Sequence, residues 1–487
     1  MDAHSIKKLL NNMFIAGFQG EEPSCEIKNA IKNGLGGVIF FSNNIQDREK
    51  FKKTVDGLKS LSDGALIVSI DQEGGLVERT INLDDKVDYI SPMGIAQSDD
   101  KSLVKSHYDI LSRELSSFGI NMNFAPVCDV NTEEKNSIIG IRSFSQNPQR
   151  VGELAGEVVD VFRSNGIFST AKHFPGHGGS CDDSHRGMVV MDLDVDELKR
   201  THIAPFKEAI KHGVDAVMVA HAIYPALDEK NPASLSPVVI SYLREQLGFE
   251  GVVISDDMVM GAIAKYYSPE EACIKAIDAG VNMLIFRNYT KDSDKLIEFL
   301  AGYALEHPEF FEKIEYSNEK ILGLKSRITE RDIKFDVEDA RKKVFEMSKK
   351  TFVVLRNNIS LSKTDRVLIL RPKRENIHSY KTDKFLVSDL WGLKNPCEME
   401  YSLNPEEDEI LSLCRLAEGY ERVVFVSYNA VLFEGQRKLI SRLKIDAALC
   451  AGVPYDNKFF EKIPFLSDIF GYKKYGFLNL RDSLINS

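Results

Sequence analysis

Cysteine is scarce in this chain, and long apolar runs are missing. Of the 487 residues only 7 are cysteines, an odd number, and they form no Cys-x-x-Cys pair. A disulfide framework or a zinc finger needs paired, closely spaced cysteines, so this usage indicates reduced thiols. No uncharged apolar run is long enough to cross a bilayer, and the first residues lack the apolar core of a signal peptide. We therefore expect a cytoplasmic protein with no membrane partner.

Positive charge is also in deficit. Lysine and arginine number 62 against 73 aspartates and glutamates, which gives a formal net charge of -11 at pH 7. An acidic surface repels polyanions, so we expect no nucleic acid as a partner. The chain does have a hydrophobic fraction of 43% beside 28% charged residues, which is typical of globular proteins with a large core. Its length predicts two or three domains.

Short apolar runs recur along the first part of the chain, separated by polar or helix-like sequence. The runs lie at residues 13–17, 37–41, 65–70, 121–127, 167–171, 216–220, 251–255 and 283–286. Alternation of strand and helix predicts a parallel sheet, and this number of units predicts a closed (β/α)₈ barrel. Helical periodicity is clearest at residues 103–118, 151–162 and 198–210.

Beyond the eighth run the pattern changes twice. Residues 286–350 are charged and helical, and we interpret them as the last barrel helices and a connector. Further strands are then predicted at 352–355, 367–370, 423–426 and 447–450, with helices at 409–417 and 437–443. This pattern predicts a smaller three-layer α/β domain, and it contains no nucleotide-binding glycine motif. We expect a TIM-like α/β barrel at 1–335, a connector at 336–350 and an accessory domain at 351–487.

The densest group of titratable side chains follows the fifth run. Residues 172–185 hold three histidines, one lysine and two aspartates around a proline and three glycines, which let the backbone turn tightly. Polar residues also follow other runs, at Asp71, Asp129, His221, Asp256 and Asp257. Because the C-terminal ends of barrel strands build the active site, we expect one pocket to collect these groups. A glycine-rich surface turn is the alternative for the loop.

Three segments carry a more specific signal. They are Asp-Gln-Glu-Gly-Gly at 71–75, Lys-His-Phe-Pro-Gly-His-Gly at 172–178 with Asp-Ser-His at 183–185, and Ser-Asp-Asp at 255–257. Together they resemble glycoside hydrolase family 3, and within it the β-N-acetylglucosaminidases. The resemblance spans the barrel, while the second domain resembles the family's accessory domain only in pattern. It implies a retaining exo-enzyme that takes a carbohydrate substrate, releases N-acetylglucosamine from peptidoglycan fragments or chitin oligosaccharides, and needs no cofactor or metal. A role in peptidoglycan recycling would follow.

The resemblance assigns catalytic roles at three positions. Asp256 corresponds to the nucleophile, whose carboxylate attacks the anomeric carbon and forms a covalent glycosyl-enzyme. His185 corresponds to the acid/base, because an imidazole titrates near neutral pH and can both give and take a proton. Asp183 would orient that ring and stabilise its protonated form. The alternatives are a helix N-cap for Asp256 and Asp257, and a surface histidine beside an acid for His185.

Sugar binding is implied at five further positions, namely Asp71, Arg79, Arg142, Lys172 and His173. A carboxylate accepts hydrogen bonds from hydroxyl groups, while arginine and lysine donate them. Taken singly, each arginine or lysine could instead be a solvated or salt-bridged side chain. Leu76 departs from the family, which usually carries arginine there, and this leaves the local charge balance open. We interpret His177 and Asp129 as structural.

Other functions compete with hydrolysis. A metal-dependent hydrolase could use the histidines of the 172–185 loop with Asp183, but Pro175 interrupts the helix that a His-Glu-x-x-His zinc pair requires. A phosphorylase is closer, since a neutral histidine repels phosphate less than a glutamate does. A β-glucosidase of the same family is another alternative. A catalytically silent sugar-binding protein is disfavoured by the presence of both Asp256 and His185. The sequence leaves the oligomeric state open.

Overall fold

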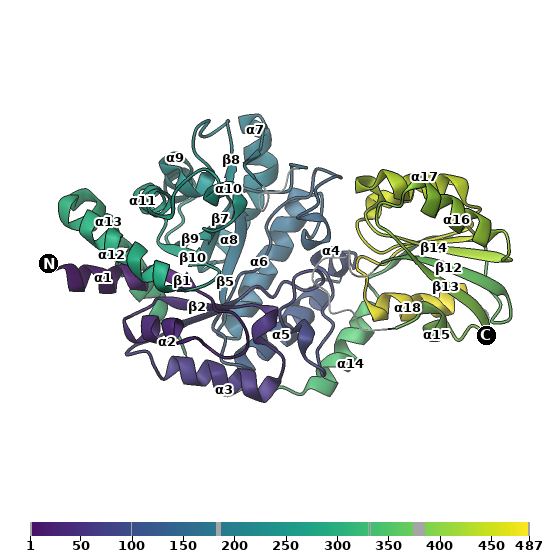
Figure 1. Cartoon of the computed structure of the whole chain (residues 1–487), viewed down its shortest axis with the longest axis horizontal. Helices are drawn as coiled ribbons and strands as arrows, with labels where there is room; N and C mark the ends of the chain where they lie inside the picture. The colour runs from purple at the N-terminus through teal and green to yellow at the C-terminus, as the bar shows by residue number, and fades with distance from the viewer. Residues whose placement is uncertain are drawn as a thin grey trace.

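The computed structural model describes residues 2–98, 100–181, 187–329, 331, 333–373 and 385–485. The chain forms a barrel and a smaller sheet domain, joined by helix α14 (Val337–Ser348) (Figure 1). This confirms the predicted architecture of a TIM-like barrel followed by an α/β domain. We keep the division at residues 335 and 350 as a proposal, with α14 as the connector. The predicted catalytic residues Asp183 and His185 lie outside the described residues.

Parallel strands form the closed barrel. They are β1 (Phe14–Ala16), β2 (Gly37–Phe40), β3 (Ile67–Ile70), β4 (Met122–Asn123), β5 (Phe168–Phe174), β7 (Ala216–Val219), β9 (Val252–Asp257) and β10 (Met283–Phe286). Their order around the barrel is β1-β10-β9-β7-β5-β4-β3-β2. Each predicted run overlaps one strand. Two strands continue past their runs, since β5 includes Lys172 and His173 and β9 ends with Asp256 and Asp257. Backbone pairing, and not apolar character, sets where these strands end.

Helices cover the outside of the barrel. They are α1 (Ala3–Asn12), α2 (Cys25–Lys32), α3 (Arg48–Lys59), α4 (Pro92–Ile95), α5 (Lys101–Ser117), α6 (Pro148–Ser164), α7 (Val195–Glu197), α8 (Ala204–Lys211), α9 (Pro237–Ser241), α10 (Gly261–Ala264), α11 (Pro269–Ala279), α12 (Lys291–Glu306) and α13 (Pro308–Lys325). Helix α6 shows why they begin where they do: the Asn147 side chain accepts from the Gln149 and Arg150 amides, and Pro148 takes the first helical position. The helix predicted at 198–210 begins instead as a π-helical segment, Leu198–Ile203, before α8. A short pair, β6 (Val189–Val190) and β8 (Ala222–Ile223), lies outside the barrel sheet.

The second domain is a mixed sheet between two layers of helices. Its strands are β11 (Val353–Asn357), β12 (Arg366–Pro372), β13 (Asn395–Tyr401), β14 (Arg422–Ser427), β15 (Ala447–Cys450) and β16 (Phe465–Asp468), in the order β11-β16-β15-β14-β12-β13. Strand β11 is antiparallel to β16, and the other pairs are parallel. Figure 1 shows α15 (Val387–Trp391) and α18 (Lys474–Leu484) on one face of the sheet, and α16 (Glu407–Ala417) and α17 (Glu434–Arg442) on the other. The three-layer prediction is confirmed.

Each face of this sheet has its own core. On one face the buried Trp391 donates its indole N–H to the Phe477 carbonyl at 2.8 Å, so the polar atom of this large side chain is satisfied. On the other face Tyr401 stacks on Phe425 with ring centroids 5.1 Å apart. The sheet of the second domain is therefore packed on both faces.

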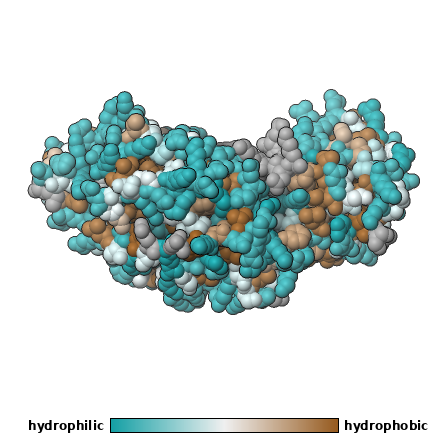
Figure 2. Space-filling model, turned by 90° about the horizontal axis from the view of Figure 1, so that it is seen from below, coloured by the Kyte–Doolittle hydropathy of each residue, from teal (hydrophilic) through white to brown (hydrophobic). Residues whose placement is uncertain are grey.

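The loops at the carboxyl ends of β14, β15 and β16 pack against the barrel. Buried residues from both parts form what we call the interdomain cluster, which consists of Met93, Ile141, Val431, Val453 and Phe470. Leu76 packs against this cluster. The position where the family usually carries arginine therefore makes an apolar interdomain contact in this chain. Figure 2 shows the barrel and the second domain side by side, with a largely hydrophilic outer face that carries scattered hydrophobic patches. In the part of the chain that the structure describes, no helix combines the length and apolarity needed to span a bilayer.

Candidate active site

An ionic network links the ends of β3 and β5 at the barrel mouth. Lys172, whose side chain is 2% exposed, places its Nζ atom 2.7 Å from Asp71 Oδ1 and 2.6 Å from Glu73 Oε1. Arg142 donates to both Glu73 oxygens, from Nε at 2.8 Å and from a terminal nitrogen at 2.9 Å. Arg79 reaches Asp71 Oδ2 at 3.2 Å. Charges of opposite sign therefore alternate through the network.

These cations keep both carboxylates ionised. Burial would raise the pKa of Glu73, but Arg142 and Lys172 outweigh it and hold that pKa at about 2. Burial is likewise outweighed at Asp71, where Lys172 and Arg79 hold the pKa well below its usual value. Asp71 is partly exposed and can accept hydrogen bonds from a sugar, whereas Glu73 is buried and serves to orient Lys172 and Arg142.

Asp129 anchors the start of the 172–185 loop. Its Oδ2 atom lies 2.7 Å from His173 Nδ1, and its Oδ1 atom accepts from the His177 amide at 2.6 Å. A carboxylate can only accept, so Nδ1 of His173 carries the proton. Burial opposes ionisation of Asp129, but His173 and His177 hold its pKa at about 2. At Gly178 an added Cβ would lie 1.9 Å from the Val130 carbonyl oxygen, so this approach of the loop to the β4 side requires glycine.

Asp256 lies at the end of β9, partly exposed, beside the same group of side chains. Its Oδ1 atom accepts from the Asp257 amide at 2.8 Å. Burial would raise the pKa of Asp256, but the neighbouring His173, His221 and Lys172 and the bond from that amide outweigh it, so the pKa lies below its usual value. The nearest following helix, α10, has Met260 at its N-cap, so neither aspartate caps a helix. Asp256 is thus an ionised carboxylate at the barrel mouth.

His221 and Asp257 surround that carboxylate. His221 Nε2 lies 3.1 Å from the Asp257 carbonyl, which can only accept, so Nε2 donates and Nδ1 accepts from the Ser234 hydroxyl at 2.7 Å. Burial lowers the pKa of His221, which keeps this tautomer neutral. The Asp257 side chain turns to Arg287, whose Nε is 3.2 Å from Oδ2. Of the two adjacent aspartates, Asp257 is therefore engaged in an ion pair with the exposed Arg287.

Residues 5–322 match the model of the glycosyl hydrolase family 3 N-terminal domain. The chain belongs to this family. Among family relatives, β-hexosaminidase A of Pseudoalteromonas piscicida is 35% identical over 272 residues, which are 52% of this chain and 45% of that protein. This chain therefore spans less than half of that relative. A β-hexosaminidase of Tolumonas auensis is 35% identical over 276 residues, 55% of this chain and 81% of its own length.

A solved structure of the same family resembles both domains. The β-N-acetylglucosaminidase of Paenibacillus sp. str. FPU-7 superposes with a TM-score of 0.88 at 29% identity, over 98% of this chain and 95% of that one. The pairing of barrel and accessory domain is therefore shared with a family 3 relative and is not particular to this chain.

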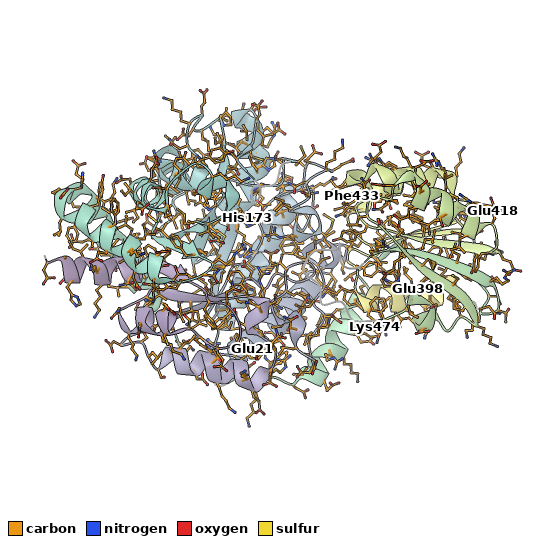
Figure 3. The ribbon with its side chains drawn as sticks, in the orientation of Figure 1. Glu21, His173, Glu398, Glu418, Phe433 and Lys474 are labelled. Carbon is orange, nitrogen blue, oxygen red and sulfur yellow. The ribbon has the colours of Figure 1, made fainter. Side chains whose placement is uncertain are left out.

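The structure brings most of the expected site residues of this family 3 chain together. Figure 3 shows His173 among the barrel strands. Hydrogen bonds and ion pairs group Asp71, Arg79, Arg142 and Lys172 around Glu73, and His173 and Lys172 lower the pKa of Asp256. Asp183 and His185 lie outside the described residues. Within those residues, no three His, Cys, Asp or Glu side chains are placed to hold a metal ion.

Two residues were expected near the pocket from sequence but were given no role there. Glu73 belongs to the Asp-Gln-Glu-Gly-Gly segment, but its role depends on Arg142 and Lys172, which are far away in the chain. A second acid two residues after Asp71 was the available signal. His221 had only its place after the sixth run, and its contact with Asp257 appears when β7 and β9 pair.

Proposed function

We propose that the chain is a retaining exo-β-N-acetylglucosaminidase that removes terminal β-linked N-acetylglucosamine from peptidoglycan fragments or chitin oligosaccharides. The observation that carries the proposal is Asp256, an ionised carboxylate at the end of β9, beside the Asp71, Lys172 and Arg79 network. The names of the relatives support the same activity. The expected cytoplasmic location and the role in peptidoglycan recycling stay predictions from the sequence.

The proposed reaction proceeds in two steps. In the first, an Asp256 oxygen bonds to the anomeric carbon while His185 gives its proton to the departing glycosidic oxygen. In the second, His185 takes a proton from water, the water oxygen bonds to the anomeric carbon, and Asp256 leaves as a carboxylate. Each step inverts the anomeric centre, so the configuration is retained. Asp183 would hold the His185 ring, and Asp71, Arg79, Lys172, His173 and Arg142 would bind or frame the sugar.

Replacement of Asp256 tests the nucleophile. Asp256→Asn keeps the shape of the side chain but removes its charge, so turnover of an aryl β-N-acetylglucosaminide should fall by about 10³-fold or more. Asp257→Asn is the matched control next to it in sequence, and it should lose much less because that side chain pairs with Arg287. Stopped assays measure the rates, and proton NMR of the first product should show the β-anomer. An Asp256→Asn enzyme with undiminished rate refutes the assignment.

Replacement of His185 tests the acid/base and the competing phosphorylase. His185→Ala should slow substrates with poor leaving groups more than substrates with good ones, because only the former need a proton at the glycosidic oxygen. The assay compares aryl glycosides of graded phenol acidity, each with and without inorganic phosphate. Equal loss across the series contradicts the role of His185. A rate that requires phosphate and yields sugar 1-phosphate would replace hydrolysis with phosphorolysis.

A further inference from the structure

The segment after β3 is a closed turn with a proposed sugar contact at each end. The Glu73 amide donates to the Val77 carbonyl at 2.9 Å. The Gln72 side-chain oxygen accepts from the Arg79 amide at 2.6 Å. These bonds tie Asp71 at one end to Arg79 at the other, and we call residues 71–79 the sugar loop. The placement of its two charged ends depends on what holds the turn.

Glu78 holds this turn from inside. Its Oε1 atom accepts from the Gly75 amide at 3.0 Å. Gly75 has φ of +66°, and an added Cβ would lie 2.5 Å from Ser91 Cβ, so the turn is built closely around this glycine. The Glu78 side chain is 1% exposed, and burial raises its pKa to about 7 although Lys473 lowers it. A carboxylate this deeply buried requires a cation to stay ionised.

That cation comes from the other domain. Lys473, the residue before α18, places its Nζ atom 2.8 Å from Glu78 Oε2 and 3.5 Å from Asp88 Oδ1, and its side chain is 4% exposed. Lys86 completes the group at 3.1 Å from Asp88. Figure 3 shows the next residue, Lys474, on the side of the second domain beside α14. Lys86 also lowers the pKa of Glu78, but its printed ion pair is with Asp88, so removal of Lys473 would take away the cation that bonds Glu78 directly.

We propose that Lys473 is a positioning residue for the sugar loop: through Glu78 and the Gly75 amide, the second domain sets the placement of Asp71 and Arg79. The inference rests on the proposed binding of the sugar at those two residues. Leu76 supports it, because this side chain packs against the interdomain cluster from the same loop. The loop therefore meets the second domain through an apolar contact as well as through an ion pair. The second domain thereby shapes the site through Lys473 and Glu78.

Kinetics of two Lys473 variants test the proposal against a matched control. Lys473→Met should raise KM for an aryl β-N-acetylglucosaminide about tenfold or more, with kcat reduced by less than about threefold, because binding is lost equally from the ground and transition states. Lys473→Arg keeps the charge and should return KM to within about threefold of wild type. Lys458→Met removes an exposed interdomain ion pair with Glu134 and should change KM by less than about twofold. A merely structural role would not produce this KM-selective loss with rescue by arginine.

A second readout needs no activity. Hydrogen exchange of the ligand-free protein should show the amides of residues 71–79 exchanging about tenfold faster in Lys473→Met, and unchanged in Lys458→Met. If the wild type fails to turn over the N-acetylglucosaminide, the proposed function is refuted while the exchange still decides the role of Lys473. If Lys473→Met is active but exchange and KM match wild type, the positioning role is refuted.

The double variant Glu78→Gln/Lys473→Met covers the case in which Lys473→Met does not fold. It removes both charges and keeps an oxygen that can accept from the Gly75 amide. Because the two side chains act as one unit, its KM should rise by less than the product of the two single effects. Where a single variant cannot be purified, the double variant alone should fold and show the faster exchange at 71–79. Multiplicative single effects, or a double variant with wild-type exchange, would overturn the inference.

Discussion

Carboxylates stand at the carboxyl ends of strands in both sheets, and Glu73 and Asp129 of the barrel are held in the opposite state to Asp468 of the second domain. At the barrel mouth Glu73 and Asp129 are buried, yet their pKa values are held at about 2. In the second domain Asp468 ends β16 and is buried as well, but its pKa is raised to about 7. Arg142 and Lys172 contact Glu73, and His173 contacts Asp129, whereas Asp468 accepts from the neutral Asn457 amide at 2.9 Å.

The difference in pKa shows that the partners of a carboxylate, and not its place at a strand end, decide whether it stays ionised. The carboxyl ends of parallel strands provide a place for polar groups in either domain. In the barrel, Lys172 and Arg142 keep negative charge available at an accessible mouth. In the second domain the corresponding loops carry Val431, Val453 and Phe470, which are buried against the barrel. Position in the fold is shared, and the partners of each carboxylate decide its chemistry.

The largest effect is expected when the barrel carboxylates lose their shared cation. Lys172→Met would leave the buried Glu73 and the partly exposed Asp71 with less positive charge, and breaking such a group costs roughly 3–5 kcal/mol of unfolding free energy. Turnover should fall as well, since Asp71 would lose its alignment. Urea unfolding at pH 7 measures the cost. Lys7→Met, which breaks an exposed pair with Glu298, is the control and should change stability little.

Unfolding at low pH tests the same three residues, because the pKa values of the two carboxylates fix the direction of the stability change with pH. The pKa values of Asp71 and Glu73 are lower in the folded chain than their usual values, so their contribution to stability is present above about pH 4 and is lost as pH falls toward 2. Without Lys172 both pKa values rise, and acid unfolding should begin at a higher pH. Identical acid transitions in the variant and the wild type would contradict the role of Lys172 as the shared cation.

A smaller loss of stability is expected when a charge is placed where the loops of the second domain pack against the barrel. Val453 is 3% exposed, and its Cγ1 atom lies 3.3 Å from the point that a Cβ atom added to Gly140 of the barrel would occupy. Val453→Asp would bury an unpaired carboxylate between the domains and should cost roughly 2–3 kcal/mol. Calorimetry should then show the two domains unfolding at more widely separated temperatures. Val238→Asp, at a position 52% exposed, is the control; a single unshifted transition in Val453→Asp would show that these loops do not pack against the barrel.

The barrel could be predicted because its strands are compact apolar runs at regular spacing. The two missed strands of the second domain lack that signal. Strand β13 is an edge strand with Glu398 and Glu400 along its length, and β16 has only four residues, two of them polar. Their pairing with β12 and β15 comes from neighbouring strands, which a single stretch of sequence does not contain.

The site could be predicted in its members but not in its connections. Motif resemblance indicated Asp71, Lys172 and Asp256, and the structure groups them. The ion pair of Glu73 with Arg142 joins residues 69 positions apart, and that of Glu78 with Lys473 joins residues 395 positions apart. Such pairs depend on how distant strands and domains pack, so the spacing of residues within one motif cannot predict them. The catalytic roles of Asp183 and His185 remain predictions.

The smallest effect is expected from removing the buried carboxylate of Asp468 in the second domain. The pKa of Asp468 is raised in the folded chain, so its contribution to stability is full below about pH 4 and is lost as pH rises through about 7. Asp468→Asn removes this titration, so its unfolding free energy should fall less than that of wild type between pH 5 and pH 9. Turnover should change little, because the Asp468 side chain bonds Asn457 of its own domain. The exposed Asp408→Asn is the control, and urea unfolding at the two pH values measures the slope. Equal slopes in all three proteins would mean that Asp468 is ionised like the barrel carboxylates, and the contrast between the two sheets would then disappear.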